Sequence, residues 1–192
     1  MDLLKSRICQ EGKILPGNII KVDGFLNHKV DTALMEYIAQ EFGKIFDVKK
    51  ITAVLTAEAS GIPVATICAM KYGVPLIFAK KAKSDNIESG LYTSETWSYT
   101  YKKAVTFIVS KEWITPQDNI LIIDDFMAKG NALKGLIDIV RQSKASLEGI
   151  GIVVEKGFQG GGDALRADSS LNYHALAVID RADENGIVFR EN

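Results

Sequence analysis

The sequence predicts an α/β domain in which a parallel β-sheet is flanked by helices on both faces. Short apolar and β-branched runs alternate along the chain with segments whose apolar residues recur at helical spacing. Residues 120–123 are four aliphatic residues in succession, as in a strand buried on both faces. The length of 192 residues fits a single domain with a sizeable core, and no internal repeat or linker divides it.

The expected elements follow one another along the chain. Residues 16–30 are rich in turn residues yet carry apolar side chains, which predicts an N-terminal arm that either packs on the core or covers a ligand as a small cap. Residues 84–103 are polar and precede an apolar run, which favours either a plain edge hairpin or a mobile lid that keeps water from a ligand. Helices are expected over residues 2–11, 31–46 and 62–72 and after Gly130, and strands over residues 51–56, 74–79, 120–123, 147–154, 174–180 and 187–189.

The composition excludes several classes of function. The net charge is −1, so no basic field draws the chain to nucleic acid or to a membrane surface. No apolar run approaches the ~20 residues of a membrane-spanning helix, and the first residues lack the pattern of a signal peptide. Cys9 and Cys68 are too few for a disulfide framework and indicate reduced thiols. We therefore expect a cytoplasmic protein whose partners are small molecules.

The stretch from Ile120 to Leu133 organises the rest of the chain. A buried strand leads into Asp124 and Asp125, and a short loop with Gly130 then opens a helix. Backbone N–H groups and the helix dipole at such a turn favour a phosphate. The acids can accept hydrogen bonds from sugar hydroxyls or lie near a metal or a developing positive charge. Although acidic pairs beside turns are ordinary, this stretch predicts a ribose site next to a phosphate site.

Polar or small residues also follow other strand-like runs. Residues 58–61 come after the strand expected at 51–56 and form either a plain loop or an anion-binding loop. Lys80, Lys81 and Lys83 cluster after residues 74–79, where they are either a solvated face or a polyphosphate contact. Because the carboxyl ends of parallel strands meet at one edge of the sheet, we expect these groups to converge there.

Three residues suit a flat heterocycle. Lys156 follows residues 147–154, and its ammonium can only donate, so it would select a carbonyl rather than an amino group. Phe158 could stack on a ring. Asn27 offers both a donor and an acceptor. The alternative interpretations are that Lys156 is a surface lysine, that Phe158 is a core residue and that Asn27 belongs to an arm packed on the core.

The central stretch resembles the motif with which type I phosphoribosyltransferases bind 5-phosphoribosyl-1-pyrophosphate (PRPP). That motif is four apolar residues, two acids, two apolar residues, Ala, a polar residue, Gly and two small residues. The matching positions are Asp124, Asp125, Ala128 and Gly130. Lys129 and Ala132 stand where the family usually has Thr or Ser, which removes hydroxyl contacts to a 5′-phosphate but leaves the backbone N–H cradle.

Together with Phe25–His28 and Glu155–Gln159, the motif makes the chain similar to the xanthine-specific branch of this family, which acts in purine salvage. The resemblance implies transfer of the 5-phosphoribosyl group of PRPP to N9 of xanthine, giving xanthosine 5′-monophosphate and pyrophosphate. It also implies a homodimer, Mg²⁺ bound mainly through PRPP and pyrophosphate, a hood from residues 1–30 and 156–192, and a hairpin lid over about residues 81–104.

The resemblance and the side-chain chemistry together give a set of candidate site residues. They are the catalytic Asp124 and Asp125, the PRPP-binding Ala128, Lys129, Gly130, Asn131 and Ala132, the pyrophosphate-binding Glu58, Ala59, Ser60, Gly61 and Lys81, and the xanthine-binding Ile20, Asn27, Lys156 and Phe158. No residue stands out as a general base, although Asp125 is a candidate. Two alternatives stay open: a guanine or hypoxanthine phosphoribosyltransferase, and a PRPP-sensing regulator without catalysis.

Overall fold

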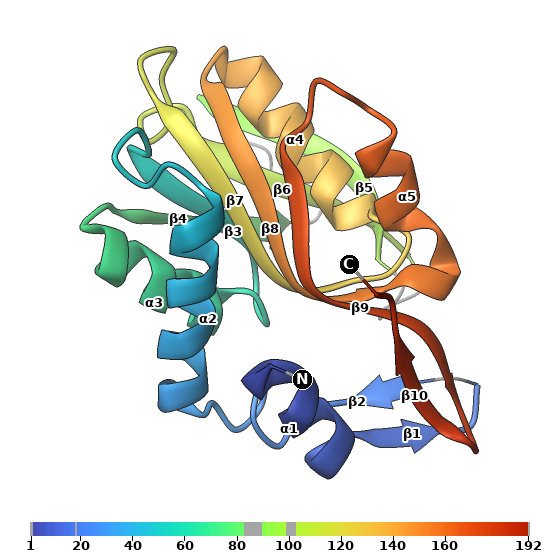
Figure 1. The fold of residues 1–192 in the computed structure, drawn as a ribbon. Coiled ribbons are helices and arrows are strands. Elements are labelled where there is room, and N and C mark those ends of the chain that lie inside the picture. Colours follow the sequence, from blue (N-terminus) through green and yellow to red (C-terminus); the bar gives the residue numbers. More distant parts are fainter. Residues whose placement is uncertain (1, 18, 83–89, 99–102, 192) are drawn as a thin grey trace.

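The computed structural model describes residues 2–17, 19–82, 90–98 and 103–191, and these fold around an eight-stranded sheet (Figure 1). The strand order is β10-β9-β8-β7-β3-β4-β6-β5. The five strands from β9 to β4 are parallel to their neighbours, whereas β10 at one edge and the β6–β5 pair at the other run antiparallel. The bounds are β3 Ala53–Ala57, β4 Leu76–Ala82, β5 Leu91–Ser98, β6 Lys103–Ser110, β7 Asn119–Met127, β8 Ser146–Lys156, β9 Tyr173–Asp183 and β10 Gly186–Phe189.

Helices cover both faces of the parallel strands, as predicted. Leu121 and Ile123 of β7 pack into a core with α2 (Thr32–Ile45) and α3 (Ile62–Tyr72). The alternate residues Ile120 and Ile122 pack with α4 (Asn131–Ser143) on the opposite face. Each of these four strand side chains is buried. The unbroken aliphatic run of β7 is therefore required by burial on both faces.

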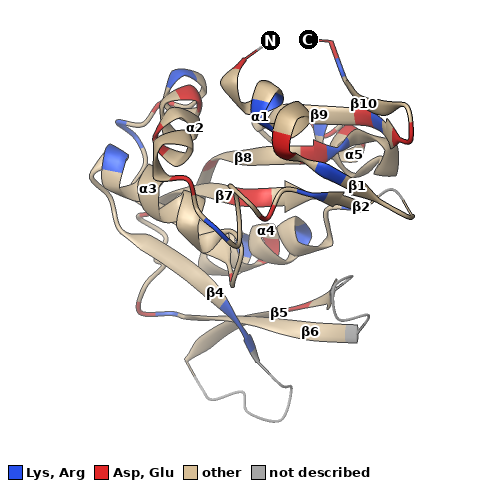
Figure 2. Ribbon diagram, turned by 90° about the horizontal axis from the view of Figure 1, so that it is seen from below, with Lys and Arg blue, Asp and Glu red and all other residues tan. Residues whose placement is uncertain are grey.

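The two ends of the chain lie side by side at one end of the sheet (Figure 1). Helix α1 (Leu3–Glu11) packs against β9 and β10. The predicted N-terminal arm contains a two-stranded ribbon, β1 (Lys13–Leu15) and β2 (Ile19–Lys21), and the buried Phe25 and Leu26 fasten it to the core. Figure 2 shows this ribbon on one side of the carboxyl end of β7 and the β5–β6 hairpin on the other.

The β5–β6 hairpin pairs along all of its described length, from Leu91↔Ser110 to Ser98↔Lys103. It also extends β4, because Lys80 and Lys81 pair with Ile108 and Phe107 of β6. The strand expected at 74–79 therefore begins two residues later, at Leu76, and ends three residues later, at Ala82, so these two lysines lie within it rather than after it. Lys83 and the parts 83–89 and 99–102 of the predicted lid lie outside the described residues, so its role as a lid stays a prediction.

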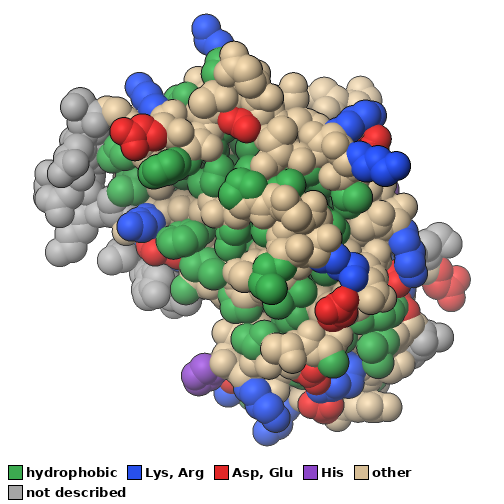
Figure 3. All heavy atoms as spheres, turned by 90° about the vertical axis from the view of Figure 1, so that its left-hand side faces the viewer, with side chains coloured by type: hydrophobic (Ala, Val, Ile, Leu, Met, Phe, Trp, Pro, Cys, Tyr) green, Lys and Arg blue, Asp and Glu red, His purple; other side chains and the backbone are tan. Residues whose placement is uncertain are grey.

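Two short helices complete the fold between β8 and β9: the 3-10 helix η2 (Gly157–Gln159) and α5 (Gly161–Arg166). Among the described residues, no helix is both long and apolar enough to cross a membrane. Figure 3 views the side on which α2 and α3 lie in Figure 1, where exposed apolar side chains stand among charged ones. One large apolar side chain left exposed is that of Met70 on α3.

Candidate active site

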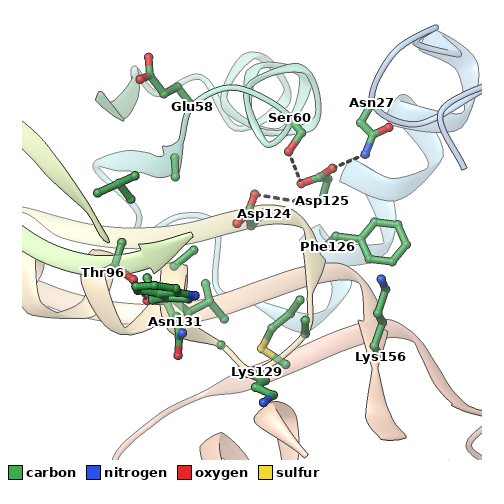
Figure 4. A pocket seen from close by; sticks show the side chains of 18 of the residues that line it. Asn27, Glu58, Ser60, Thr96, Asp124, Asp125, Phe126, Lys129, Asn131 and Lys156 are labelled. Atoms are coloured by element: carbon green, nitrogen blue, oxygen red, sulfur yellow. Dashed lines mark hydrogen bonds between the residues drawn. The ribbon is translucent and has the colours of Figure 1, made fainter. Parts of the chain in front are cut away.

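The order of the strands creates a crevice between β3 and β7. From β3 the chain continues to β4 on one side, whereas from β7 it continues to β8 and β9 on the other. Open α/β sheets bind ligands outside the carboxyl ends of the strands at such a reversal. A cavity of about 440 Å³ lies there, and its walls come from the N-terminal arm, the loops after β3 and β7, the hairpin and the end of β8 (Figure 4).

Asp124 and Asp125 lie at the centre of this cavity, 7% and 3% exposed. The side chains of Ser60 and Asn27 point toward Asp125 from two different segments (Figure 4). Ser60 Oγ donates a hydrogen bond to Asp125 Oδ1 at 3.0 Å, and Asn27 Nδ2 donates to Asp125 Oδ2 at 2.8 Å. The backbone N–H of Asp125 donates to Asp124 Oδ1 at 3.0 Å. Asp125 therefore connects the arm, the loop after β3 and the central strand.

The electrostatic surroundings of Asp124 disfavour its charged form. Burial raises the pKa of Asp124 well above its ordinary value, and the neighbouring charge of Asp125 raises it further. A carboxylate in such a place favours any group that brings positive charge or hydrogen-bond donors to it. Ribose hydroxyls and a ribose ring that becomes positive are both groups of this kind.

The loop after β3 approaches Asp124 very closely. A Cβ atom at Gly61 would lie 2.2 Å from Thr56 Oγ1 and 2.3 Å from Asp124 Oδ1, so only glycine fits. Glu58, Ser60 and Lys81 line the cavity, whereas Ala59 and Gly61 do not. Glu58 Oε1 accepts a hydrogen bond from the backbone N–H of Lys81.

The loop from Ala128 to Ala132 lines the cavity along its whole length. Gly130 adopts φ 78°, ψ 13°, a left-handed conformation that favours glycine, and α4 begins at the next residue. Within the part of the chain that the structure describes, no side chain caps the first turn of α4. The N–H groups of this first turn therefore meet the requirement for binding an anion, and their use for a phosphate stays a prediction. Thr96 Oγ1 of β5 donates to Asn131 O at 2.8 Å and so joins the hairpin to this loop.

The opposite end of the cavity is lined by Ile20, Asn27 and Lys156, the residues expected to contact a base. Lys156 Nζ lies 5.4 Å from the centre of the Phe126 ring (Figure 4). Burial lowers the pKa of Lys156. Phe158, in contrast, is 39% exposed and is not part of the cavity wall, so the structure does not bring it to the site.

Sequence reasoning missed Phe126 and Trp97, which both line the cavity. Phe126 counts in the sequence only as one of the two apolar positions after the acids. The pairing of β7 with β8, in which Phe126 stands opposite Val154, places its ring near Lys156. Trp97 lies on β5, and the predicted lid was the signal that pointed to this segment.

The residues present fit a Mg²⁺ ion that arrives with a phosphate ligand. Among the described residues, no group of three or more His, Cys, Asp or Glu side chains is arranged to hold a metal. Mg²⁺ is commonly bound through one or two carboxylates together with the phosphates of a substrate. Asp124 and Asp125 meet that requirement, whereas the described residues alone would not form a complete coordination shell.

The chain is similar to known proteins over nearly its full length. Residues 25–161 match the family model described as a phosphoribosyl transferase domain. The xanthine phosphoribosyltransferase of Lachnoclostridium phytofermentans is 50% identical over 99% of this chain and 98% of its own. That of Ruminiclostridium cellulolyticum is 49% identical over 100% of both chains. The structure of an adenine phosphoribosyltransferase from Giardia lamblia complexed with 9-deazaadenine superposes with a TM-score of 0.74 at 18% identity, covering 93% of this chain and 98% of the other, which indicates the same fold.

Proposed function

The chain belongs to the phosphoribosyltransferase family, and on that premise we propose that it transfers the 5-phosphoribosyl group of PRPP to N9 of xanthine. The products are xanthosine 5′-monophosphate and pyrophosphate. The observation that carries the proposal is one cavity that contains the loop from Ala128 to Ala132, the buried pair Asp124 and Asp125, and Lys156. Relatives that are 43–50% identical over nearly the full chain bear the name of this activity.

In this mechanism the backbone N–H groups of the loop from Ala128 to Ala132 bind the 5′-phosphate. Asp124 and Asp125 accept hydrogen bonds from the ribose hydroxyls. Departure of pyrophosphate leaves positive charge on the ribose ring, and a buried carboxylate whose ionisation is disfavoured gains most from that charge. The interaction is therefore stronger in the transition state than in the ground state, which is the condition for faster chemistry.

The base lies at the other end of the cavity, beside Phe126 and Lys156. The Lys156 ammonium donates to the 6-oxo group of the purine, and the ring of Phe126 offers a flat apolar face. Adenine carries an amino group at that position, so two donors would meet and the site would disfavour it. The Asn27 amide donates one of its two hydrogens to Asp125. Its second hydrogen can donate to the base, and its carbonyl oxygen can accept from the base. We propose that the second amide hydrogen of Asn27 donates to the 2-oxo group of xanthine.

Mg²⁺ would be held mainly by the pyrophosphate of PRPP, with Asp124 and Asp125 as carboxylates of the same cavity that could contribute, and would neutralise charge on the leaving group. Glu58, Ser60 and Lys81 line the same cavity, and Glu58 accepts a hydrogen bond from the backbone N–H of Lys81, so we assign these residues to the same pyrophosphate group. We also propose a homodimer, as the family resemblance implies. A cytoplasmic location is supported by the free thiols of Cys9 and Cys68.

The test is pyrophosphate release by the purified protein with Mg²⁺ and PRPP, with xanthine, guanine, hypoxanthine and adenine offered separately. We expect kcat/KM for xanthine to exceed that for every other base by at least tenfold. Preference for guanine or hypoxanthine, which share the 6-oxo group, would refute the base assignment while keeping the reaction. Tight PRPP binding without turnover of any base would instead indicate a non-catalytic sensor.

Side-chain variants separate the roles at the base end of the cavity. Lys156→Ala removes a charged hydrogen bond worth about 1.5–3 kcal/mol, so we expect kcat/KM for xanthine to fall about 10- to 150-fold. Asn27→Ala should raise the KM for xanthine. Lys50→Ala, at an exposed lysine paired with Asp47, is the matched control and should leave every constant unchanged. Molar mass in solution, measured by light scattering, tests the homodimer.

A further inference from the structure

Glu155 immediately precedes Lys156, and the function proposed above gives it no role. Its side chain is fully buried, at 0% exposed. Arg166, the last residue of α5, donates from Nη1 to Glu155 Oε1 at 3.0 Å and from Nη2 to Glu155 Oε2. Tyr173 Oη, at the start of β9, donates to Glu155 Oε2 at 2.8 Å. A buried carboxylate with three such donors fixes α5 and β9 to the end of β8.

The glycines at the start of α5 connect the cluster of Glu155, Arg166 and Tyr173 to the loop from Ala128 to Ala132, which we call the phosphate loop. A Cβ atom at Gly161 would lie 2.4 Å from Ala128 O and 3.0 Å from Gly130 N, so the two backbones are in direct contact. A Cβ at Gly162 would lie 2.0 Å from Glu155 Oε1. The start of α5 is therefore held between the loop from Ala128 to Ala132 and the Glu155 carboxylate.

The same cluster also reaches the residue before the loop. Tyr173 Oη lies 3.8 Å from Sδ of Met127, the residue that pairs with Glu155 across β7 and β8. The phosphate loop thus has a support at its entry, through Met127 and Tyr173. It has a second support along its first residues, through Gly161 and α5.

We propose that Glu155, Arg166 and Tyr173 are positioning residues that hold the loop from Ala128 to Ala132 in the geometry that binds a 5′-phosphate. The inference rests on the proposed function of that loop. The loop contains no Ser or Thr, so its own side chains offer the phosphate no hydroxyl, and the binding depends strongly on the direction of its backbone N–H groups. Such groups act well only when the surrounding structure fixes them before the ligand arrives.

The test compares two ligands of one cavity by titration calorimetry. Ribose 5-phosphate reports on the phosphate loop, whereas pyrophosphate reports on the loop after β3. We expect Arg166→Met to raise the Kd of ribose 5-phosphate about tenfold and to leave the Kd of pyrophosphate within twofold of wild type. Equal changes in both constants, or no change in either, would overturn the proposal.

A second substitution separates positioning from stability. Arg166→Met leaves Glu155 as an uncompensated buried charge, and adding Glu155→Gln removes that charge. We expect the double variant to recover melting temperature while its Kd for ribose 5-phosphate stays within twofold of the single variant. Recovery of both quantities would show a structural role only. If these variants do not fold, Tyr173→Phe, which deletes one hydroxyl, is the substitute test. It should raise the Kd of ribose 5-phosphate about threefold, and an unchanged Kd would count against the proposal.

The matched control is Arg181→Met, since Arg181 is exposed on β9 and pairs with Asp183 at 3.3 Å. It should leave both dissociation constants within twofold of wild type. The two proposals fail in different ways. Wild type that binds ribose 5-phosphate but turns over no base refutes the proposed function and leaves this inference standing. Wild type that turns over xanthine while Arg166→Met binds both ligands normally refutes this inference alone.

Discussion

Replacing Gly61 by alanine tests whether the loop after β3 positions Asp124. The added Cβ would lie 2.3 Å from Asp124 Oδ1 and 2.2 Å from Thr56 Oγ1, whereas ordinary contact begins at 3.4 Å. The difference between 3.4 and 2.3 Å requires Asp124 or the loop to move by about 1.1 Å. A misplacement of about 1 Å near reacting groups can lower the rate about 100-fold. We therefore expect Gly61→Ala to lower kcat by about that factor.

The cost in stability is smaller. Overpacking of this kind costs about 1–3 kcal/mol, and the reduced freedom of the unfolded chain offsets about 0.4–1 kcal/mol of it. The backbone at Gly61, with φ −73° and ψ −21°, accepts alanine without strain. A net loss of about 1–2 kcal/mol lowers the melting temperature of a domain this size by about 2–8 °C, measured by calorimetry.

Gly43→Ala is the matched control, because a Cβ there would meet Tyr72 Cε1 at an ordinary 3.5 Å inside helix α2. It should stabilise the protein by about 0.5–1 kcal/mol and leave kcat unchanged. Gly61→Ala with activity within threefold of wild type and an unchanged melting temperature would refute the argument that this loop positions the acid.

Three further predictions concern the same cavity. Asp124→Asn should lower kcat about 10²–10³-fold yet raise the melting temperature at pH 7. Because burial raises the pKa of Asp124 in the folded state, this acid costs stability at every pH above its unfolded pKa of about 3.9. The gain from Asp124→Asn should therefore vanish below about pH 4, where the acid is protonated in both states. Lys156→Met should also raise the melting temperature at pH 7, since burial lowers the pKa of the lysine, and the gain should shrink as pH approaches 10.5. Thr96→Val removes a hydrogen bond to Asn131 O worth about 0.5–1.5 kcal/mol, so the KM for PRPP should rise about two- to tenfold, with Thr93→Val as the control on the same strand.

The sequence located the central elements because their signals are local. The aliphatic run and the two acids of β7 mark a doubly buried strand and its carboxyl end. Helical periodicity after Gly130 marks α4, which begins at Asn131. The hairpin at the β5 edge was expected, whereas the pairing of its second strand β6 with β4 was not predicted, because it joins residues distant in the chain. For the same reason the carboxyl end of β4 was predicted three residues too early, since its pairing with β6 extends it through Lys80 and Lys81.

The site residues that lie at the carboxyl ends of strands could be predicted from the sequence. Those whose position depends on how two strands pair with each other could not. Asp124, Asp125 and Lys156 converge because parallel strands end at one edge. Phe126 was missed and Phe158 was expected instead, because the sequence does not say which ring faces the cavity. That choice is made by the pairing of β7 with β8 and by the turn of η2, which leaves Phe158 exposed.

The two adjacent acids are set apart by their partners, and this difference suggests separate roles. Both carboxylate oxygens of Asp125 accept hydrogen bonds, from Ser60 and from Asn27, so its orientation is fixed by the loop after β3 and by the arm. Among the described residues, the Asp124 carboxylate accepts its hydrogen bond from the backbone N–H of Asp125, and burial raises the pKa of Asp124. Neighbouring carboxylates in different surroundings commonly take different roles in a reaction. We therefore propose that Asp125 links the base end of the cavity to the ribose, and that Asp124 is the acid that gains most when positive charge develops beside it.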